Sequence, residues 1–346
     1  MKKYSLLVIV IVIVMVIIAG WVFKIVFISQ SNGNLTKNFV VKAGSGVNQI
    51  SHDLKKAGLI DSSSVFETYL WLKKSEGKIL AGEHTLSPAW SIRKLVNALT
   101  SGSALENEAV IKIIEGWDLY DLADYFEKNN IVSKDDFYKL VGQPGQHDNK
   151  NLLNWAKDYK FLEEKPAGVS LEGYLFPDTY RVYKNAKIED VIKKTLDNFG
   201  QKIDAKVMSD INAQNKSLYD ILTLASIIEK EAKTAADKKT VAGVYYNRLE
   251  IGMALQADPT VNYVTGKTTD RPSLDDLKVD SLYNTYQYPG LPPGPICNPG
   301  LDSILAAVYP EKNDYFYFIN TPDGKLIFAK DLDEHRRNRE KYFINN

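Results

Sequence analysis

The sequence contains little cysteine and little histidine. Its single cysteine, Cys297, excludes an internal disulfide and any metal site built from cysteines. The four histidines (His52, His84, His147 and His335) are scattered, and no HExxH motif occurs, which argues against a zinc hydrolase. We therefore expect no metal site and no other cofactor.

The sequence also lacks an excess of charge of either sign. Its 346 residues include 43 Lys and Arg and 43 Asp and Glu, so nothing in the charge balance predicts nucleic acid as a partner. The length leaves room for two or three domains, and a hydrophobic content of 45% allows most of the chain to fold around cores. Twenty tyrosines offer aromatic faces that suit stacking on sugar rings.

Residues 4–23 contain no charged side chain. A helix of this length, at about 1.5 Å rise per residue, spans a bilayer core of about 30 Å. Lys2 and Lys3 precede it and favour a cytoplasmic N-terminus. A cleaved signal peptide is the alternative, but its apolar region is shorter and residues 21–27 contain no small-residue cleavage site. We expect a retained single-pass anchor in the cell (inner) membrane over residues 1–28, a linker over 29–38 and an extracytoplasmic remainder.

The first half of the chain contains a repeated pattern. Residues 41–65 match residues 113–137 at a constant spacing of 72 positions, and each copy reads as strand, glycine turn, helix, polar break and second helix. After the first copy we expect a strand at 81–86 and a helix at 91–99. After the second copy we expect a loop at 142–148, a strand at 172–176 and a helix at 188–199.

This order resembles that of a LysM module, a small fold that binds N-acetylated glycan. We predict a LysM-like βααβ unit over residues 39–104 and a second βαα unit with a connecting region over 105–170. A mixed α+β catalytic domain then covers 171–346, so the fold class is α+β. The alternative is that the repeats are spacers that hold a head away from the membrane.

Residues 221–232 predict a helix that ends on two carboxylates. On a wheel of about 100° per residue, Ile221, Leu224 and Ile228 share an apolar face. Glu231 falls within this face, and Glu229 falls to its side. Desolvation raises the pKa of a carboxyl group on an apolar face, which suits a general acid near neutral pH. The alternative is that Glu231 lies at a fraying helix end and reaches water.

Polar residues gather after this helix. A second helix is expected to open at residues 234–237 and to end near Gly252. Pro259 disfavours a helical backbone at Asp258, so we expect a stiff turn there, with Gln256 and Asp258 on one face. Residues 290–300 are rich in proline and glycine and are expected to form a rigid cleft wall. Singly these polar residues suit turn or cap roles; clustered near one semi-buried acid, they favour a site.

The second half also contains motifs similar to those of the YceG-like family of endolytic murein transglycosylases. These motifs are residues 225–231 (ASIIEKE), 247–249 (NRL), 252–253 (GM), 255–260 (LQADPT), 283–286 (YNTY) and 290–296 (GLPPGPI), and upstream residues 115–116 and 172–180. The likeness extends from about residue 39 to the end of the chain, and the layout of anchor, LysM-like unit and catalytic domain is similar too.

The resemblance implies that Glu231 is the catalytic acid and that the substrate is the glycan strand of peptidoglycan. It implies cleavage, without water, of the β-1,4 bond from N-acetylmuramic acid to N-acetylglucosamine, leaving a 1,6-anhydro end. It also implies a role in terminating nascent strands near a peptidoglycan synthase. The alternatives are a muramidase-type hydrolase and a non-catalytic scaffold that binds peptidoglycan for a synthase.

A single acid requires a particular mechanism. Glu229 and Glu231 point about 160° apart on a regular helix, so they cannot flank one bond as a carboxylate pair. We expect Glu231 to act first as acid and then as base, with help from the substrate's own acetamido group. The predicted substrate-binding residues are Gln256, Asp258, Asn284, Thr285, Tyr286, Asn247 and Asn298.

Two further predictions concern sugar stacking by a tyrosine and the role of His335. Tyr283 or Tyr286 is expected to stack on a sugar. His335 lies in a charge-rich run that predicts a solvated terminal helix, with a role in the site as the alternative.

Overall fold

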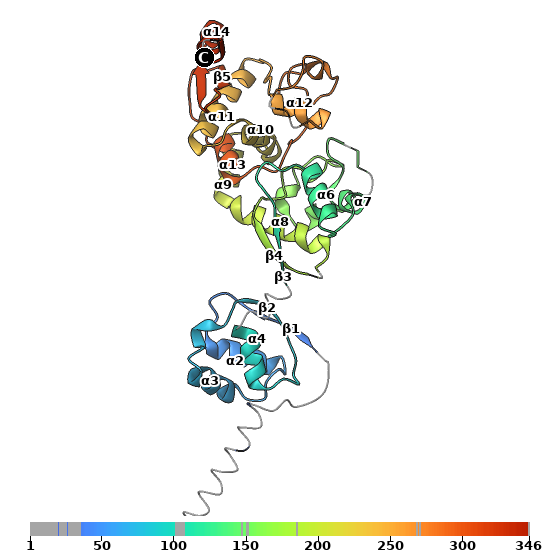
Figure 1. The fold of residues 1–346 in the computed structure, drawn as a ribbon, viewed down its shortest axis with the longest axis vertical. Helices are drawn as coiled ribbons and strands as arrows, with labels where there is room; N and C mark the ends of the chain where they lie inside the picture. The colour runs from blue at the N-terminus through green and yellow to red at the C-terminus, as the bar shows by residue number, and fades with distance from the viewer. Residues whose placement is uncertain are drawn as a thin grey trace, which may run out of the picture. The chain divides into compact units, whose positions relative to one another are not determined.

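The protein is described here from a computed structural model that covers residues 20, 26, 36–100, 108–146, 148–149, 152–184, 186–267, 269 and 271–344. The chain divides into two compact units, residues 1–109 and 110–346. In Figure 1 the described part of the first unit is coloured blue to cyan and the second unit green to red. Each unit is described by itself below.

The first unit has the predicted order of strands and helices. It contains β1 (Lys37–Val41), α2 (Val47–Lys56), α3 (Ser63–Leu72), a short 3-10 turn η1 (Glu76–Lys78), β2 (Gly82–Leu86) and α4 (Ile92–Thr100). The strands β1 and β2 pair antiparallel, with Phe39 opposite His84. The apolar faces of the three helices and the inward residues of both strands form one core that includes Leu54, Phe66 and Leu99.

The second unit begins with the same order of elements. It contains β3 (Glu108–Lys112), α6 (Leu119–Lys128), α7 (Lys134–Val141), the 3-10 turns η2 (Trp155–Lys157) and η3 (Lys160–Leu162), β4 (Thr179–Tyr183) and α8 (Ile188–Lys202). Asp118 and Asp121 form a capping box that fixes the start of α6. Strand β3 pairs with β4, so the sheet joins segments on both sides of the boundary predicted at residue 170.

The strand predicted at residues 172–176 is wrong. This segment turns, and the paired strand β4 begins only at Thr179. Gly173 has φ +87, and a Cβ at this position would lie 2.7 Å from a Pro295 ring carbon. The amides of Gly173 and Leu175 donate to the side-chain oxygen of Asn298 rather than to a strand. An apolar run thus packs as a buried turn because its backbone partner is a distant side chain.

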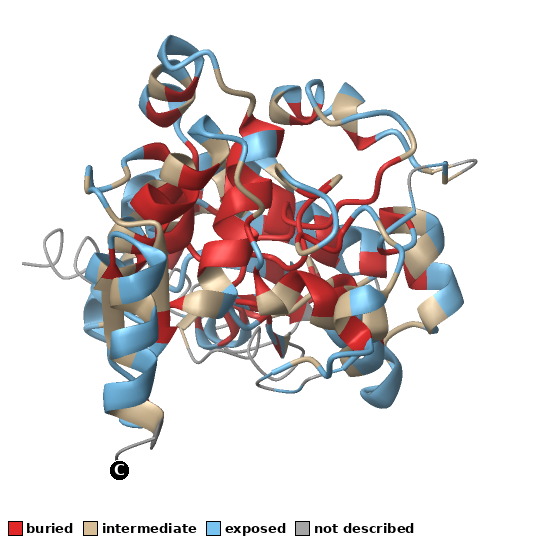
Figure 2. Ribbon diagram, turned by 90° about the horizontal axis from the view of Figure 1, so that it is seen from above, coloured by how far each residue is buried: buried red, intermediate tan, exposed pale blue. Residues whose placement is uncertain are grey.

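Helices dominate the rest of the second unit. They are α9 (Ala205–Ala213), α10 (Leu218–Glu231), α11 (Ala235–Glu250), α12 (Asp258–Thr265), the 3-10 turn η4 (Asp276–Lys278) and α13 (Leu301–Val308). Helix α10 contacts α9, α11, α12 and α13, and every residue from Ile221 to Ile228 is buried. Figure 2 shows this concentration of buried residues at the centre of the unit. The predicted single apolar face was therefore too narrow, because α10 is enclosed on all sides.

A small hairpin and a terminal helix complete the unit. β5 (Tyr317–Asn320) pairs antiparallel with β6 (Leu326–Ala329), and α14 (Leu332–Arg339) continues into the π-helical turn η5 (Glu340–Ile344). Helix α14 contacts both strands, and none of its residues is buried. The predicted solvated helix around His335 is confirmed. Figure 2 shows its exposed residues in the helix that leads to the C-terminus.

The predicted membrane span lies outside the described residues, apart from Gly20. Of the helices that the structure describes, none is long and apolar enough to cross a bilayer.

Candidate active site

The second unit contains a cleft of about 1610 Å³. Its walls come from the start of α6, the end of α10, α11, α12, the β5–β6 hairpin and α14. Glu231, the last residue of α10, lies in this cleft. The helix delivers this residue because Ser217 caps its first turn and the buried faces of α10 fix its length and direction.

Glu231 is half-buried, and its carboxyl group is desolvated. Burial is the main cause that raises its pKa to about 7, and the negative charge of Asp258 adds to this rise. A hydrogen bond from Tyr245 and the positive charge of Arg248 act in the opposite direction. A carboxyl group with a pKa of about 7 can carry its proton near neutral pH, as a general acid requires. Glu231 is desolvated, as its place on the apolar face of the predicted helix led us to expect, and it also lines the cleft.

Two residues of α11 act on the Glu231 carboxyl group, Tyr245 through a hydrogen bond and Arg248 through its charge, and the sequence-based prediction missed both. The Tyr245 hydroxyl donates to a Glu231 carboxylate oxygen over 3.2 Å. Arg248 is 6% exposed, and its guanidinium donates to the backbone oxygens of Phe316 at 2.6 Å and Leu255 at 2.7 Å. The available signal was the spacing of Tyr245 and Arg248, one turn apart within an otherwise apolar helix face.

Three of the predicted binding residues lie in the cleft with Glu231. They are Gln256, Asp258 and Tyr286. The Tyr286 hydroxyl donates to the Asp258 carboxylate over 2.6 Å, so each fixes the other. Gln256 has φ +49, a left-handed backbone that non-glycine residues rarely adopt, and its amide donates to the Thr285 carbonyl. The turn at 256–258 thus presents two polar side chains to the cleft.

The turn does not take the predicted form at Asp258. Asp258 and Pro259 are the first residues of α12 and are not an extended turn. Proline is tolerated in a first helical turn because its missing amide hydrogen would have no partner there. Helix α12 therefore begins in the cleft, with Asp258 in its first turn.

The other predicted binding residues do not line the cleft. Asn298 and Asn284 are fully buried. The Asn298 side-chain oxygen accepts from the distant amides of Gly173 and Leu175, and the Asn284 amide group donates to the nearby carbonyls of Leu277 and Val279. Thr285 is buried and accepts from the Ala257 amide, while Asn247 donates to backbone oxygens of Asn313 and Tyr315. These four side chains build the loops that carry the cleft residues.

The proline-rich loop and Tyr283 are also more buried than predicted. Residues 295–300 are buried throughout, and Ile296 is the residue of 290–300 that lines the cleft. The Ile296 amide donates to the Ser226 hydroxyl of α10 over 2.9 Å. Tyr283 is 6% exposed and packs its ring 5.1 Å from that of Tyr263, which does line the cleft. The loop is bonded to α10 and does not form the exposed cleft wall expected from the sequence.

Glu229 forms a buried ion pair with Lys238. Their side chains are 9% and 5% exposed, and the two groups are 3.1 Å apart. The Glu229 carboxylate also accepts from the Gly300 amide at 2.9 Å and the Ser303 hydroxyl at 2.5 Å. This network ties the end of α10 to α11 and α13. The side chain is more buried than its wheel position to the side of the apolar face indicated.

A second buried carboxyl group, Glu172, lies close behind the cleft. It is 2% exposed and accepts from the Leu119 amide at 3.1 Å and the Tyr263 hydroxyl at 3.2 Å. Burial, and then the charge of Asp118, raise its pKa well above the usual range. The pKa of Asp118, a cleft residue, is raised to about 6, mainly by burial. Nothing in the helical pattern pointed to Glu172, since its partners come from other elements.

His335 lines the cleft from α14. Its ring lies 5.2 Å from that of Tyr317, and its Nδ1 has no hydrogen-bond partner. Partial burial, together with the charges of Arg339 and Arg248, lowers the pKa of the imidazole, which is therefore neutral near pH 7.

Comparison with known proteins identifies the family of this chain. The model of the YceG-like family matches residues 39–341. The chain belongs to the YceG-like family. A relative from Bacillus subtilis, named endolytic murein transglycosylase, is 35% identical over 322 residues, which cover 90% of this chain and 86% of that protein.

Two further members are similar to the chain. A Streptococcus pneumoniae D39 protein with the same name is 31% identical over 86% of this chain and 57% of its own length. The crystal structure of a yceG-like protein from Listeria monocytogenes shares 35% identity and a TM-score of 0.58, and covers 88% of this chain and 100% of that one. The match extends through both units of this YceG-like chain.

Proposed function

We propose that this YceG-like protein is a peptidoglycan lytic transglycosylase with Glu231 as its acid and base. The half-buried carboxyl group in the cleft, with a pKa near 7, carries the proposal. The names of the relatives supply the substrate class, murein, and the reaction class. The bond cut is the β-1,4 link from N-acetylmuramic acid to N-acetylglucosamine.

The first step is a proton transfer. Protonated Glu231 donates to the glycosidic oxygen as the bond to C1 of the muramic acid breaks. Positive charge develops at C1, and the sugar's own 2-acetamido group stabilises it. In this proposal Asp258 accepts the acetamido N–H, and the bond from the Tyr286 hydroxyl at 2.6 Å, which orients the carboxylate, supports that role. Gln256 provides a further polar contact to the sugars from the same turn.

The second step closes the product. Ionised Glu231 accepts the proton of the C6 hydroxyl, whose oxygen attacks C1 and forms the 1,6-anhydro ring. Because nucleophile and electrophile belong to one sugar, the attack is intramolecular and gains from proximity. Glu231 returns to its protonated form, so the cycle consumes no water. The two half-reactions need opposite protonation states, which a pKa near 7 makes accessible.

A muramidase-type hydrolase is the second candidate, and one observation favours it. Asp258 and Glu231 both present carboxyl groups to one open cleft, as enzymes that activate a water do. The two products differ by one water, because hydrolysis leaves a reducing end in place of the anhydro ring. Mass spectrometry of fragments released by the purified protein therefore separates the two functions, and unchanged peptidoglycan would support the non-catalytic scaffold instead.

We also propose that residues 4–23 anchor the protein in the cell membrane, with the remainder outside the cytoplasm. The uncharged run after Lys2 and Lys3 supports this topology. The first unit, with its LysM-like order of elements, is proposed to contact glycan. Cutting within strands near the membrane would end their elongation beside a synthase. Membrane fractionation of the full chain, compared with a chain that lacks residues 1–28, tests the anchor.

A further inference from the structure

One face of α14 forms a basic wall of the active-site cleft. The residues of α14 and η5 that line the cleft are Leu332, His335, Arg336, Arg339 and Phe343. Their spacing of three or four positions places them on one helix face, and Arg337 points elsewhere. The same cleft holds Glu231. Two guanidinium groups therefore face the space that the substrate of Glu231 must enter.

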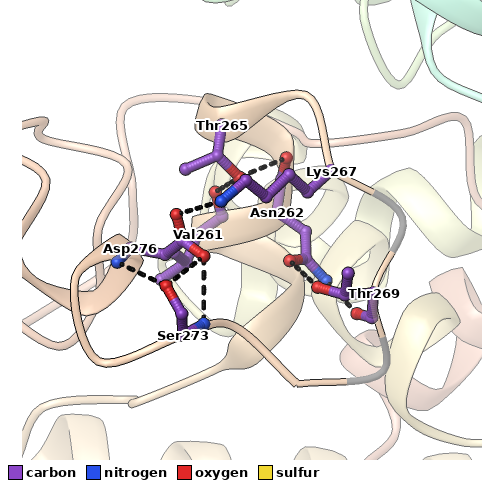
Figure 3. Close-up of polar contacts among 7 residues, drawn as sticks. All are labelled: Val261, Asn262, Thr265, Lys267, Thr269, Ser273 and Asp276. Carbon is purple, nitrogen blue, oxygen red and sulfur yellow. Dashed lines mark hydrogen bonds and ion pairs between the residues drawn. The ribbon is translucent and has the colours of Figure 1, made fainter.

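A third guanidinium, that of Arg271, lies beside this wall. It stands 5.0 Å from the ring centre of Phe343 and also lines the cleft. Figure 3 shows how the segments on both sides of Arg271 are held. Asn262 donates to the Thr269 carbonyl at 2.7 Å, and the Ser273 hydroxyl donates to the Asp276 carboxylate at 2.7 Å. These bonds thus hold Thr269 and Ser273, each two positions from Arg271.

These arginines are poorly neutralised. Arg336 is 3.7 Å from Asp333, and both side chains are well exposed, so this pair is weak. Within the part of the chain that the structure describes, Arg271 and Arg339 have no carboxylate within ion-pair distance. His335 adds no charge near pH 7, because its pKa is lowered. The wall, defined as Arg271, Arg336 and Arg339, is therefore a binding surface for anions.

The proposed substrate supplies anions of one kind in this position. In an intact strand the sugars offer only neutral hydroxyl and acetamido groups, because the lactyl carboxyl of each muramic acid is bound in the amide link to its peptide. The stem peptide carries the free carboxylates. Ligand pockets of about 300–1,000 Å³ suffice for small molecules. The cleft of about 1610 Å³ is larger than that, so it has room beside the sugars at the scissile bond. Guanidinium groups recognise carboxylates through paired hydrogen bonds.

We propose that Arg271, Arg336 and Arg339 bind the stem-peptide carboxylates of the strand being cut. This inference rests on the proposed function and adds that the enzyme distinguishes peptide-bearing strands from bare glycan. The wall positions the muramic acid through its peptide, while Glu231 performs the chemistry on the sugar. Strands from which an amidase has already removed the peptides are then poor substrates.

The test compares glycan strands with and without their peptides. Uncrosslinked strands are used either intact or after complete amidase digestion, which removes the peptide carboxylates and leaves one lactyl carboxylate on each muramic acid, and release of anhydro ends is followed for each. We expect the wild type to favour intact strands by about tenfold in kcat/KM, and this preference to shrink with added salt. In the Arg336→Gln/Arg339→Gln protein the ratio should fall towards one, and adding Arg271→Gln should complete the loss. Arg337→Gln, on the same helix but away from the cleft, is the matched control.

Equal rates of the wild type on the two substrates would overturn the inference. So would an unchanged preference in the triple variant, or the same loss in Arg337→Gln. Binding of both strands to the Glu231→Gln protein gives a readout that does not need cleavage. Arginine-dependent preference for intact strands in that experiment supports the inference even if the wild type releases no anhydro ends, which would count against the proposed function alone.

Discussion

The Tyr245 hydroxyl donates a hydrogen bond to Glu231 over 3.2 Å and so links α11 to the end of α10. The bond stabilises the ionised carboxylate and lowers the pKa of Glu231, against the larger effect of burial. Asp258 acts in the other direction through its negative charge. The acid is therefore held between a donor that favours the carboxylate and a charge that favours the protonated form.

Replacing these two neighbours should move the pH profile in opposite directions. The first step needs protonated Glu231, so kcat/KM should fall as the pH rises through its pKa of about 7. Tyr245→Phe removes the donor and should shift this alkaline limb to higher pH. Asp258→Asn removes the charge and should shift it to lower pH. Profiles of kcat/KM against pH measure both shifts. If the alkaline limbs of the two variants moved in the same direction, the assignment of Glu231 would be contradicted.

Glu231→Gln should abolish most activity without loss of fold. General acid–base catalysis contributes about 10²–10⁴-fold, so kcat should fall by that range. Release of 1,6-anhydro ends from purified peptidoglycan is the measurement, with circular dichroism as the check on folding. Wild-type rates in this variant would remove Glu231 from the mechanism.

The same substitution should stabilise the protein at alkaline pH. The folded-state pKa of about 7 lies above the ordinary value of 4.5, so the folded state binds the proton more tightly than the unfolded state. Stability therefore falls as the pH rises from 4.5 to about 7, and the full loss is present above the folded pKa. At about 1.4 kcal/mol per pKa unit, reduced by partial exposure, Glu231→Gln should gain about 1–3 kcal/mol at about pH 8. Urea unfolding of both proteins at about pH 5 and pH 8 tests this, and an equal difference at both would contradict it.

Glu229→Gln should act through stability and not through the acid. It leaves the Lys238 ammonium buried without its partner, which typically costs about 3–5 kcal/mol. The Glu229→Gln/Lys238→Met protein removes both charges and should recover part of that loss. Thermal unfolding of the wild type and of the two variants measures both the loss and the recovery of stability. Activity per folded molecule should stay far above that of Glu231→Gln, and equal losses would mean that Glu229 also takes part in the chemistry.

Substitutions at Asn298 and Gln256 should have different effects, because Asn298 supports the fold and Gln256 is proposed to bind substrate. Asn298→Ala strands the amides of Gly173 and Leu175 in the interior, at a cost of about 1–3 kcal/mol for each group. Gln256→Asn keeps a side chain that tolerates the left-handed backbone and only shortens its reach into the cleft. We expect the first to lower the unfolding midpoint with little change in KM of the folded enzyme, and the second to raise KM several-fold with an unchanged midpoint.

The sequence by itself determined the local elements and pointed to Glu231 as the candidate acid. The expected helix opening at residues 234–237 predicted the start of α11, and the apolar spacing predicted the helices of the first unit, because these signals act within one or two turns. Glu231 was identifiable because its own helix carries it into an apolar setting and a family motif contains it. The repeated order of strand, helix and helix followed from the same local rules.

The tertiary structure alone decided which polar groups surround the acid. Tyr245 bonds to Glu231 from another helix, and Arg248 of that same helix acts on it through its positive charge. Glu172 accepts from residues far away in the sequence. Asn298 appeared as a candidate ligand but bonds to backbone amides more than 120 residues away in the chain. The run at 172–176 is turned rather than extended for the same reason. A hydrogen bond depends on where the chain brings its donor and acceptor, and the one-dimensional pattern records only what each residue offers.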